Sequence, residues 1–115
     1  MTVLIVDDNP GVRRLLRRIL SQEASVIWEC SDGAEALSAF RKWHPDVVLM
    51  DIHMPRLDGF AATKRIREYH SAARIVIITD YDDNHLRATA HTLGVSGYVL
   101  KQNLIDLVEI LRSLA

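Results

Sequence analysis

The segment Pro45–Pro55 contains the feature that most limits the possible folds, a run of apolar residues over Val47–Met50 with no polar residue among them. The run is too short for a helix and lacks the alternation of a half-exposed strand, so it predicts a strand buried on both faces of a parallel sheet. Asp51 follows at once. In open α/β sheets, ligands bind beyond the carboxyl ends of the strands. Asp51 is therefore either a helix cap or a group that takes part in chemistry.

Length and composition agree with an ordinary globular protein. A chain of 115 residues is long enough for one hydrophobic core and too short for two, so we expect a single domain over 1–115. The contents of 49% hydrophobic and 25% charged residues do not favour the disordered or membrane classes. Cys30 is the single cysteine, which excludes an internal disulfide and a cysteine-rich zinc site. The first residues lack a basic leader, which favours a cytoplasmic location without membrane attachment.

Strand-like and helix-like patterns alternate along the chain, beginning with a strand. We expect strands at 2–7, 25–30, 47–50, 74–79 and 97–100, and helices at about 10–22, 34–43, 58–69, 84–93 and 104–114. The turn at 31–33 should cap the second helix, Gly94 should end the fourth, and Asn103 should cap the fifth. This alternation predicts a three-layer, doubly wound (flavodoxin-like) α/β fold with five parallel strands in the order 2-1-3-4-5 and five helices.

Side-chain patterns assign faces to the first and last helices. The apolar residues of the first helix should pack on the sheet: Val12, Leu15, Leu16, Ile19 and Leu20. Four arginines cover its other side, as a solvated face or as a docking patch: Arg13, Arg14, Arg17 and Arg18. On the last helix, Ile105 and Ile110 lie on either side of the expected core face, which suggests that another subunit of a homodimer or a domain outside this chain covers them.

Reactive or charged side chains follow four of the predicted strands. They are Asp7 with Asp8, Asp51, Thr79 and Lys101. In the predicted order the first and third strands are neighbours, about 4.8 Å apart, so the three aspartates should lie together. Carboxylates that close repel one another unless a cation or a proton intervenes. An all-oxygen site of this kind suits Mg²⁺ better than zinc.

Thr79 and Lys101 should add a hydroxyl and an ammonium group to the same place. A carboxylate nucleophile, a divalent metal, a hydroxyl and an ammonium are together what formation of an aspartyl phosphate requires. Taken singly, these residues have ordinary roles as well. Asp7 or Asp8 could cap the first helix, and Thr79 could bond to nearby backbone.

These motifs, in their order and spacing, resemble the receiver domain of bacterial two-component response regulators over essentially the whole chain. The matching segments are 6–8, 31–37, 45–55, 57–59, 78–79 and 97–101. The resemblance implies that Asp51 is phosphorylated by a histidine kinase or a phosphotransfer protein. It also implies that Asp7, Asp8, Asp51 and the carbonyl of His53 hold Mg²⁺. Such a domain catalyses its own phosphoryl transfer and hydrolysis and is not a conventional enzyme.

The resemblance further implies that Thr79 hydrogen-bonds the phosphoryl group and that Lys101 pairs with it. Tyr98 matches the aromatic position whose ring turns inward when Thr79 moves. Gln102 follows Lys101 where many receivers have proline, a pattern similar to the receivers that precede LuxR-type helix-turn-helix domains. A DNA-binding domain would then lie outside this chain, because the net charge of −1 and the motifs here give no sign of direct nucleic-acid binding.

Asp80 and Tyr81, which follow Thr79, are expected to change the rates of the phosphorylation chemistry. Asp80 stands where the family has a small residue, and its carboxylate should slow phosphorylation by small dianionic donors. Tyr81 and His53 occupy positions where the resemblance suggests control of the hydrolytic water, and bulky Tyr81 should slow dephosphorylation. Two other functions remain open, a degenerate receiver that binds partners without phosphate and a Mg²⁺-dependent hydrolase that uses Asp51 as nucleophile.

Overall fold

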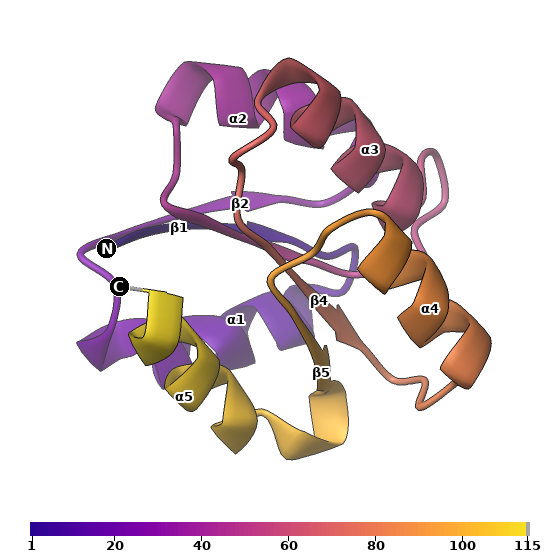
Figure 1. The fold of residues 1–115 in the computed structure, drawn as a ribbon. Helices are drawn as coiled ribbons and strands as arrows, with labels where there is room; N and C mark the ends of the chain where they lie inside the picture. The colour runs from indigo at the N-terminus through magenta and orange to yellow at the C-terminus, as the bar shows by residue number, and fades with distance from the viewer. Residues whose placement is uncertain (115) are drawn as a thin grey trace.

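The structure, a computed structural model, describes residues 1–114. Its strands are β1 (Thr2–Val6), β2 (Val26–Cys30), β3 (Val47–Met50), β4 (Ile75–Thr79) and β5 (Gly97–Leu100). Its helices are α1 (Pro10–Ile19), α2 (Ala36–Trp43), α3 (Gly59–Tyr69), α4 (Asn84–Thr92) and α5 (Ile105–Leu114). The strands form one parallel sheet in the order β2-β1-β3-β4-β5 (Figure 1), which confirms the predicted topology.

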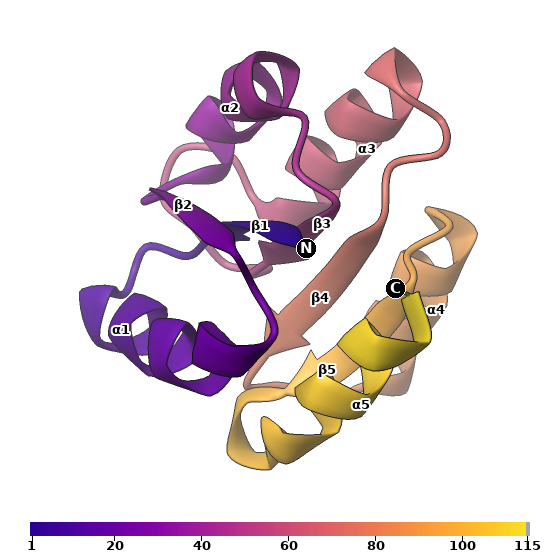
Figure 2. The same ribbon diagram turned by 90° about the vertical axis from the view of Figure 1, so that its left-hand side faces the viewer.

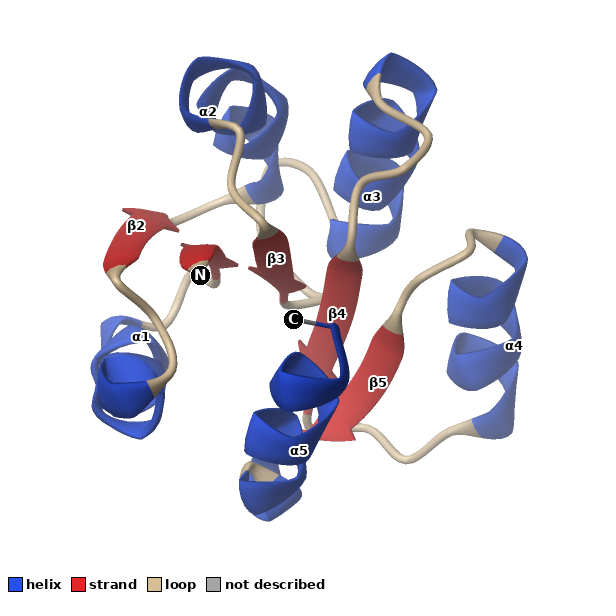
Figure 3. Cartoon of the chain, turned by 60° about the vertical axis from the view of Figure 1, so that its left-hand side comes forward, coloured by secondary structure: helices blue, strands red, loops and turns tan. Residues whose placement is uncertain are grey.

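The sheet is the middle of three layers, as Figure 3 shows. Helices α1 and α5 cover one face, and α2, α3 and α4 cover the other (Figure 2). Successive residues of each strand point to opposite faces, so the strands supply both cores. In β3, Val48 and Met50 pack on the α2 side while Val47 and Leu49 pack on the α1 side. The apolar run of the sequence is thus the doubly buried strand that it predicts.

The strand register brings the carboxyl ends of the strands to one edge of the sheet. Val6 of β1 lies opposite Met50 of β3, so the next residues, Asp7 and Asp51, leave neighbouring strands at the same level. The backbone N–H of Asp51 donates to the Val6 carbonyl at 2.9 Å. This edge is therefore where the chemistry predicted from the sequence must be sought.

Side chains or glycines mark most helix ends as the sequence predicts. Asn9 caps α1, because its Oδ1 accepts from the N–H groups of the first turn, while Gly94 follows α4 with a φ of +74°. The prediction for Asn103 is wrong. The chain tightens directly after β5 into a short 3₁₀ helix, Lys101–Asn103, so Asn103 is itself in a helical turn and α5 begins only at Ile105.

The burial of two apolar side chains also differs from the prediction. Leu15 is 43% exposed, since a step of about 100° from buried Leu16 turns it off the face that meets the sheet. Ile110 is half-buried against β5, where its Cγ2 would lie 3.2 Å from a Cβ added to Gly97. Ile105 is 81% exposed, so it alone of the two isoleucines is available to another subunit.

Half of the arginine cluster on α1 has structural partners. Arg13 Nε lies 2.9 Å from Glu29 Oε1, and Arg17 pairs with the same carboxylate, so α1 is tied to edge strand β2. Arg14 and Arg18 are exposed, and a docking patch on this helix would depend on them. Among residues 1–114, no helix is long and apolar enough to cross a membrane.

Thr63 of α3 places a hydroxyl in the core, where residues 1–114 offer it no hydrogen-bond partner. The residue is 0% exposed, and its Oγ1 has no hydrogen bond to any described residue. Replacing the hydroxyl with a methyl group of the same shape removes the cost of an unpaired buried donor, so we expect Thr63→Val to raise the free energy of unfolding by about 1 kcal/mol. Urea denaturation measures this change.

Thr92→Val in α4 is the matched control, because Thr92 is exposed and its hydroxyl already donates to the Ala88 carbonyl at 3.0 Å. We expect it to change stability little. A loss of stability in Thr63→Val would mean that the hydroxyl is satisfied in solution, contrary to the structure.

Candidate functional site

The structure brings together the three aspartates that follow β1 and β3. Asp7 is 1% exposed and Asp51 is 6% exposed, whereas Asp8 is exposed. One carboxylate oxygen from each lies within 4.8 Å of the others. Asp7 does not cap α1, because Asn9 does so and Asp7 Oδ1 instead accepts from the Asn9 N–H at 2.8 Å. Two of these carboxylates are thus buried side by side.

Lys101 reaches this cluster from the far side of β4. Its Nζ lies 3.0 Å from Asp7 Oδ2 and 3.3 Å from Asp51 Oδ1. Burial alone would lower the pKa of Lys101. The hydrogen bonds that Lys101 donates to the two carboxylates, together with their negative charges, outweigh burial and raise the pKa above its usual range. The ammonium therefore stays charged and offsets part of the negative charge.

The carboxyl group of Asp51 has a strongly raised pKa. Burial, together with the charge of Asp7, raises its pKa from 3.8 to about 6, and Lys101 reverses only part of this shift. Among the described residues, the Lys101 ammonium is the one positively charged group at Asp7 Oδ2, whereas the carboxylates of Asp8 and Asp51 both lie close to Asp7. Carboxylate oxygens with incomplete neutralisation are the ligands that a hard divalent cation prefers, so this donor set fits Mg²⁺.

Thr79 is buried at the end of β4, between the strands that lead to Asp51 and Lys101. Its hydroxyl oxygen accepts from the Tyr81 N–H at 3.3 Å. A hydroxyl that accepts in this way still has its own proton to donate. The structure thus places a hydrogen-bond donor on the strand between the carboxylates and the ammonium.

Tyr81 connects the remaining predicted residues. Its carbonyl accepts from the Tyr98 hydroxyl at 2.7 Å, and its ring packs edge-on against the His53 ring with centroids 5.0 Å apart. Arg87 of α4 lies over the Tyr98 ring at 4.5 Å. The Tyr98–Tyr81 bond could not be predicted from the sequence, because the spacing of two residues on different segments does not show which carbonyl a hydroxyl will reach.

Asp32, which the sequence predicts only as part of a turn, has a larger role in the structure. In the structure Asp32 is 5% exposed and binds the loop between β3 and α3 as well as its own turn. The aspartate in the turn was the available signal. Its distant partners could not be found from local sequence.

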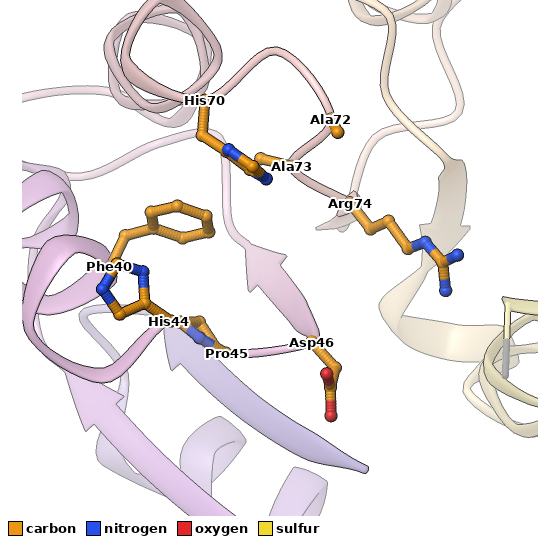
Figure 4. Close-up of a pocket in the computed structure, with 8 residues that line it drawn as sticks. All are labelled: Phe40, His44, Pro45, Asp46, His70, Ala72, Ala73 and Arg74. Carbon is orange, nitrogen blue, oxygen red and sulfur yellow. The ribbon is translucent and has the colours of Figure 1, made fainter.

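A cavity of about 340 Å³ lies at the opposite edge of the sheet, at the ends of α2 and α3 (Figure 4). Its lining includes Phe40, His44, His70 and Arg74. Asp46, also in the lining, already accepts from the Thr2 N–H at 2.7 Å. None of the residues expected to take part in chemistry lines this cavity, so we place the functional site at the acidic edge.

Comparison with known proteins identifies the family of the chain. The family model described as the response regulator receiver domain matches residues 3–112. The chemotaxis protein CheY of Halobacterium salinarum is 38% identical over 99 residues, which are 86% of this chain and 82% of that protein. The transcriptional regulatory protein YdfI of Bacillus subtilis is 38% identical over 101 residues, 86% of this chain but only 47% of that regulator. The chain thus spans less than half the length of such a relative.

Solved structures give the same result. A LuxR-family two-component response regulator from Aurantimonas sp. superposes with a TM-score of 0.85 at 34% identity, covering 97% of this chain and 85% of that chain. The response regulator TrrA of Thermotoga maritima, solved in complex with Mg²⁺ and BeF, superposes with a TM-score of 0.89 at 33% identity, covering 99% and 98% of the two chains.

The raised pKa of Asp51 predicts how pH changes the stability of the metal-free protein. A carboxyl whose pKa rises on folding stabilises the fold below its unfolded pKa and loses that contribution as the pH rises through about 6. We therefore expect Asp51→Asn to match the wild type near pH 4 and to exceed its free energy of unfolding by about 2 kcal/mol at pH 7. Urea denaturation in the presence of a chelator measures the free energies of unfolding of the two proteins at each pH.

Asp46→Asn is the control of opposite sign. The hydrogen bond from the Thr2 N–H lowers the pKa of Asp46 from its ordinary value of 3.8, so this variant should be less stable than the wild type above that pH, and the difference should shrink as the pH falls below it. Added Mg²⁺ should stabilise the wild type more than Asp51→Asn. Equal pH profiles for the wild type and Asp51→Asn would show that Asp51 is not strained by its neighbours.

Proposed function

Because the chain belongs to the response regulator receiver domain family, we propose that it is a phosphorylation-controlled signalling switch. Asp51 accepts a phosphoryl group from a histidine kinase or a phosphotransfer protein in a reaction that depends on Mg²⁺. The observation that supports this most is the position of Lys101 Nζ, 3.0 Å and 3.3 Å from two buried carboxylates at the ends of neighbouring strands.

The residues of the site would divide the work of the transfer. Asp7, Asp8, Asp51 and the His53 carbonyl would hold Mg²⁺, which supplies positive charge that offsets the carboxylates and the phosphoryl oxygens. A carboxylate oxygen of Asp51 attacks the phosphorus atom, the new O–P bond forms as the P–N bond of the phosphohistidine breaks, and the imidazole leaves. The product is an aspartyl phosphate.

Lys101 and Thr79 stabilise the transferred group. The Lys101 ammonium moves from the Asp51 carboxylate to the phosphoryl oxygens, which takes little motion because Asp51 Oδ1 is only 3.3 Å away. The Thr79 hydroxyl donates to another phosphoryl oxygen. A change in the position of Thr79 would act on the Tyr81 N–H that it binds, and through the Tyr81 carbonyl on Tyr98.

The partners of the switch follow from the same family membership. The transcriptional relatives are longer than this chain, so a DNA-binding domain would lie outside it and would act in transcription regulation. A homodimer through α5 would depend on exposed Ile105. We expect the protein to act in the cytoplasm, where kinases of this class transfer phosphate.

Phosphorylation of Asp51 is the direct test. The wild type, incubated with Mg²⁺ and a phosphorylated histidine kinase or acetyl phosphate, should gain the mass of one phosphoryl group in intact-protein mass spectrometry, and hydroxylamine should remove it. Asp51→Asn should gain none, while Asp46→Asn, at the opposite edge of the sheet, should behave as the wild type. A wild type that binds its partners but never gains phosphate would instead be a degenerate receiver, and turnover of a free phosphate ester would indicate a hydrolase.

Tyr81 should slow loss of the phosphoryl group. Tyr81 is 53% exposed and its ring packs edge-on against the ring of His53, which lies in the loop that begins at Asp51, so the ring can hinder water that approaches from this side. We expect Tyr81→Ala to hydrolyse the aspartyl phosphate severalfold faster and Tyr81→Phe to keep the wild-type rate, because the ring is retained. The decay of radiolabelled protein after removal of the donor gives these rates.

Asp80→Ala is the matched comparison at the neighbouring position. Asp80 is exposed, and we propose that its charge hinders an approaching anionic donor. This variant should gain phosphate faster from acetyl phosphate and show a smaller change in decay than Tyr81→Ala. Unchanged decay in Tyr81→Ala would refute the role of the ring.

A further inference from the structure

Asp32 forms more hydrogen bonds than a helix cap needs. Its Oδ1 accepts from the Ala34 N–H at 2.9 Å and from the Leu57 N–H at 3.1 Å, and its Oδ2 accepts from the Arg56 N–H at 3.0 Å. The bond to Ala34 caps the short 3₁₀ helix Gly33–Glu35. The other two bonds cross to the loop between β3 and α3, which begins at Asp51.

Two glycines show how closely the chain packs around this loop. A Cβ on Gly33 would lie 2.3 Å from the Leu57 carbonyl oxygen, so the turn after β2 touches the backbone that Asp32 binds. A Cβ on Gly59 would lie 1.8 Å from the Asp51 carbonyl oxygen, and the Gly59 N–H donates to the Ile52 carbonyl at 2.7 Å. The loop is therefore closed at its base by Gly59 and held near its far end by Asp32.

The bonds of Asp32 should be strong. Burial alone would raise the pKa of Asp32, but the three backbone N–H groups and the charge of Arg56 outweigh it and hold the pKa below its usual range. Hydrogen bonds to an ionised carboxylate are stronger than neutral ones. Loss of the carboxylate would leave the Arg56 and Leu57 N–H groups without these acceptors, which favours a rearranged loop.

His53 lies in this loop between its two fixed points. Its backbone carbonyl belongs to the proposed Mg²⁺ site, and its position is set by the path of the loop from Asp51 to Leu57. The carboxylates of Asp7 and Asp51 are fixed by the sheet, whereas this carbonyl is on a segment without regular secondary structure. Ligands on such a segment need outer contacts to hold them in place.

We propose that Asp32 is a positioning residue for the phosphoryl-transfer site. By holding the backbone of Arg56 and Leu57, it keeps the His53 carbonyl aligned with the carboxylates of Asp7 and Asp51. This assignment rests on the proposed function, since it concerns the same site. Its consequence is that Asp32 sets the affinity for Mg²⁺ without touching the metal or the phosphoryl group.

Two substitutions separate the bonds of Asp32. Asp32→Ala removes all of them. Asp32→Asn keeps an acceptor at the position of Oδ1 but sets an NH₂ group against the Arg56 N–H. In hydrogen exchange measured by NMR on the whole chain, we expect Arg56 and Leu57 to exchange faster in Asp32→Ala, and Arg56 alone to do so in Asp32→Asn. The exchange rate of the Ala61 N–H, which donates a hydrogen bond to Asp58 Oδ1, should not change in either variant.

The affinity for Mg²⁺ is the decisive measurement, by titration calorimetry with MgCl₂. We expect about 10-fold weaker binding in Asp32→Ala, at the lower end of the effects known for outer contacts of metal ligands. The phosphorylation rate should recover at high Mg²⁺, because the nucleophile and Lys101 are unchanged. Asp83→Ala, which removes the side-chain cap of α4 but no bond to this loop, should bind Mg²⁺ as the wild type does.

Each outcome supports or overturns the proposal. Wild-type Mg²⁺ affinity in both Asp32 variants, despite faster exchange of the loop amides, would leave Asp32 a purely structural residue. If Asp32→Ala does not fold, the Mg²⁺ affinity of Asp32→Asn, measured by the same titration, tests the proposal instead. A wild type that binds Mg²⁺ but gains no phosphate would overturn the proposed function alone, because the effect of Asp32 on Mg²⁺ affinity is measured without phosphate.

Discussion

The repulsion between two buried carboxylates is the constraint on which the rest of this structure depends. Asp7 and Asp51 leave adjacent strands at the same level, where the register of β1 and β3 holds them together, and both are almost completely buried. Lys101 lies close to both but does not restore an ordinary pKa to Asp51. The sheet and its two cores must therefore supply the stability that this edge lacks. Functional sites often reduce the stability of a protein in this way.

The sheet topology determined how much of the site could be predicted from sequence. Apolar runs and helical periodicity identified the elements, and the crossover rules then gave the strand order. Once the order is known, the residue after each strand has a known place, because all parallel strands end at one edge. This is why Asp7, Asp51, Thr79 and Lys101 could be assigned to one cluster although the chain places them far apart.

The remaining features depend on side-chain direction and on contacts between distant segments. Helical periodicity shows roughly which side of a helix Leu15 and Ile110 lie on. It does not show whether the side chain is covered, because the rotation between neighbouring residues is enough to move a side chain from the core to the surface. Asn103 was misassigned because a short 3₁₀ helix after β5 delays the start of α5. The bonds from Asp32 to the loop before α3 join residues 24 and 25 positions apart, and no local pattern indicates them.

Tyr81 explains how a change at the acidic edge could reach the surface of the molecule. Its N–H binds the Thr79 hydroxyl, its carbonyl binds the Tyr98 hydroxyl, and its ring packs on His53. Thr79 is buried at the end of β4, beside the strand that leads to Asp51, whereas the Tyr98 ring contacts Arg87 on α4. Coupling between two binding sites is reciprocal. In the proposed switch, a partner that fixes Tyr98 and Arg87 in one arrangement would therefore also change the free energy of phosphorylation at Asp51, without touching the carboxylates.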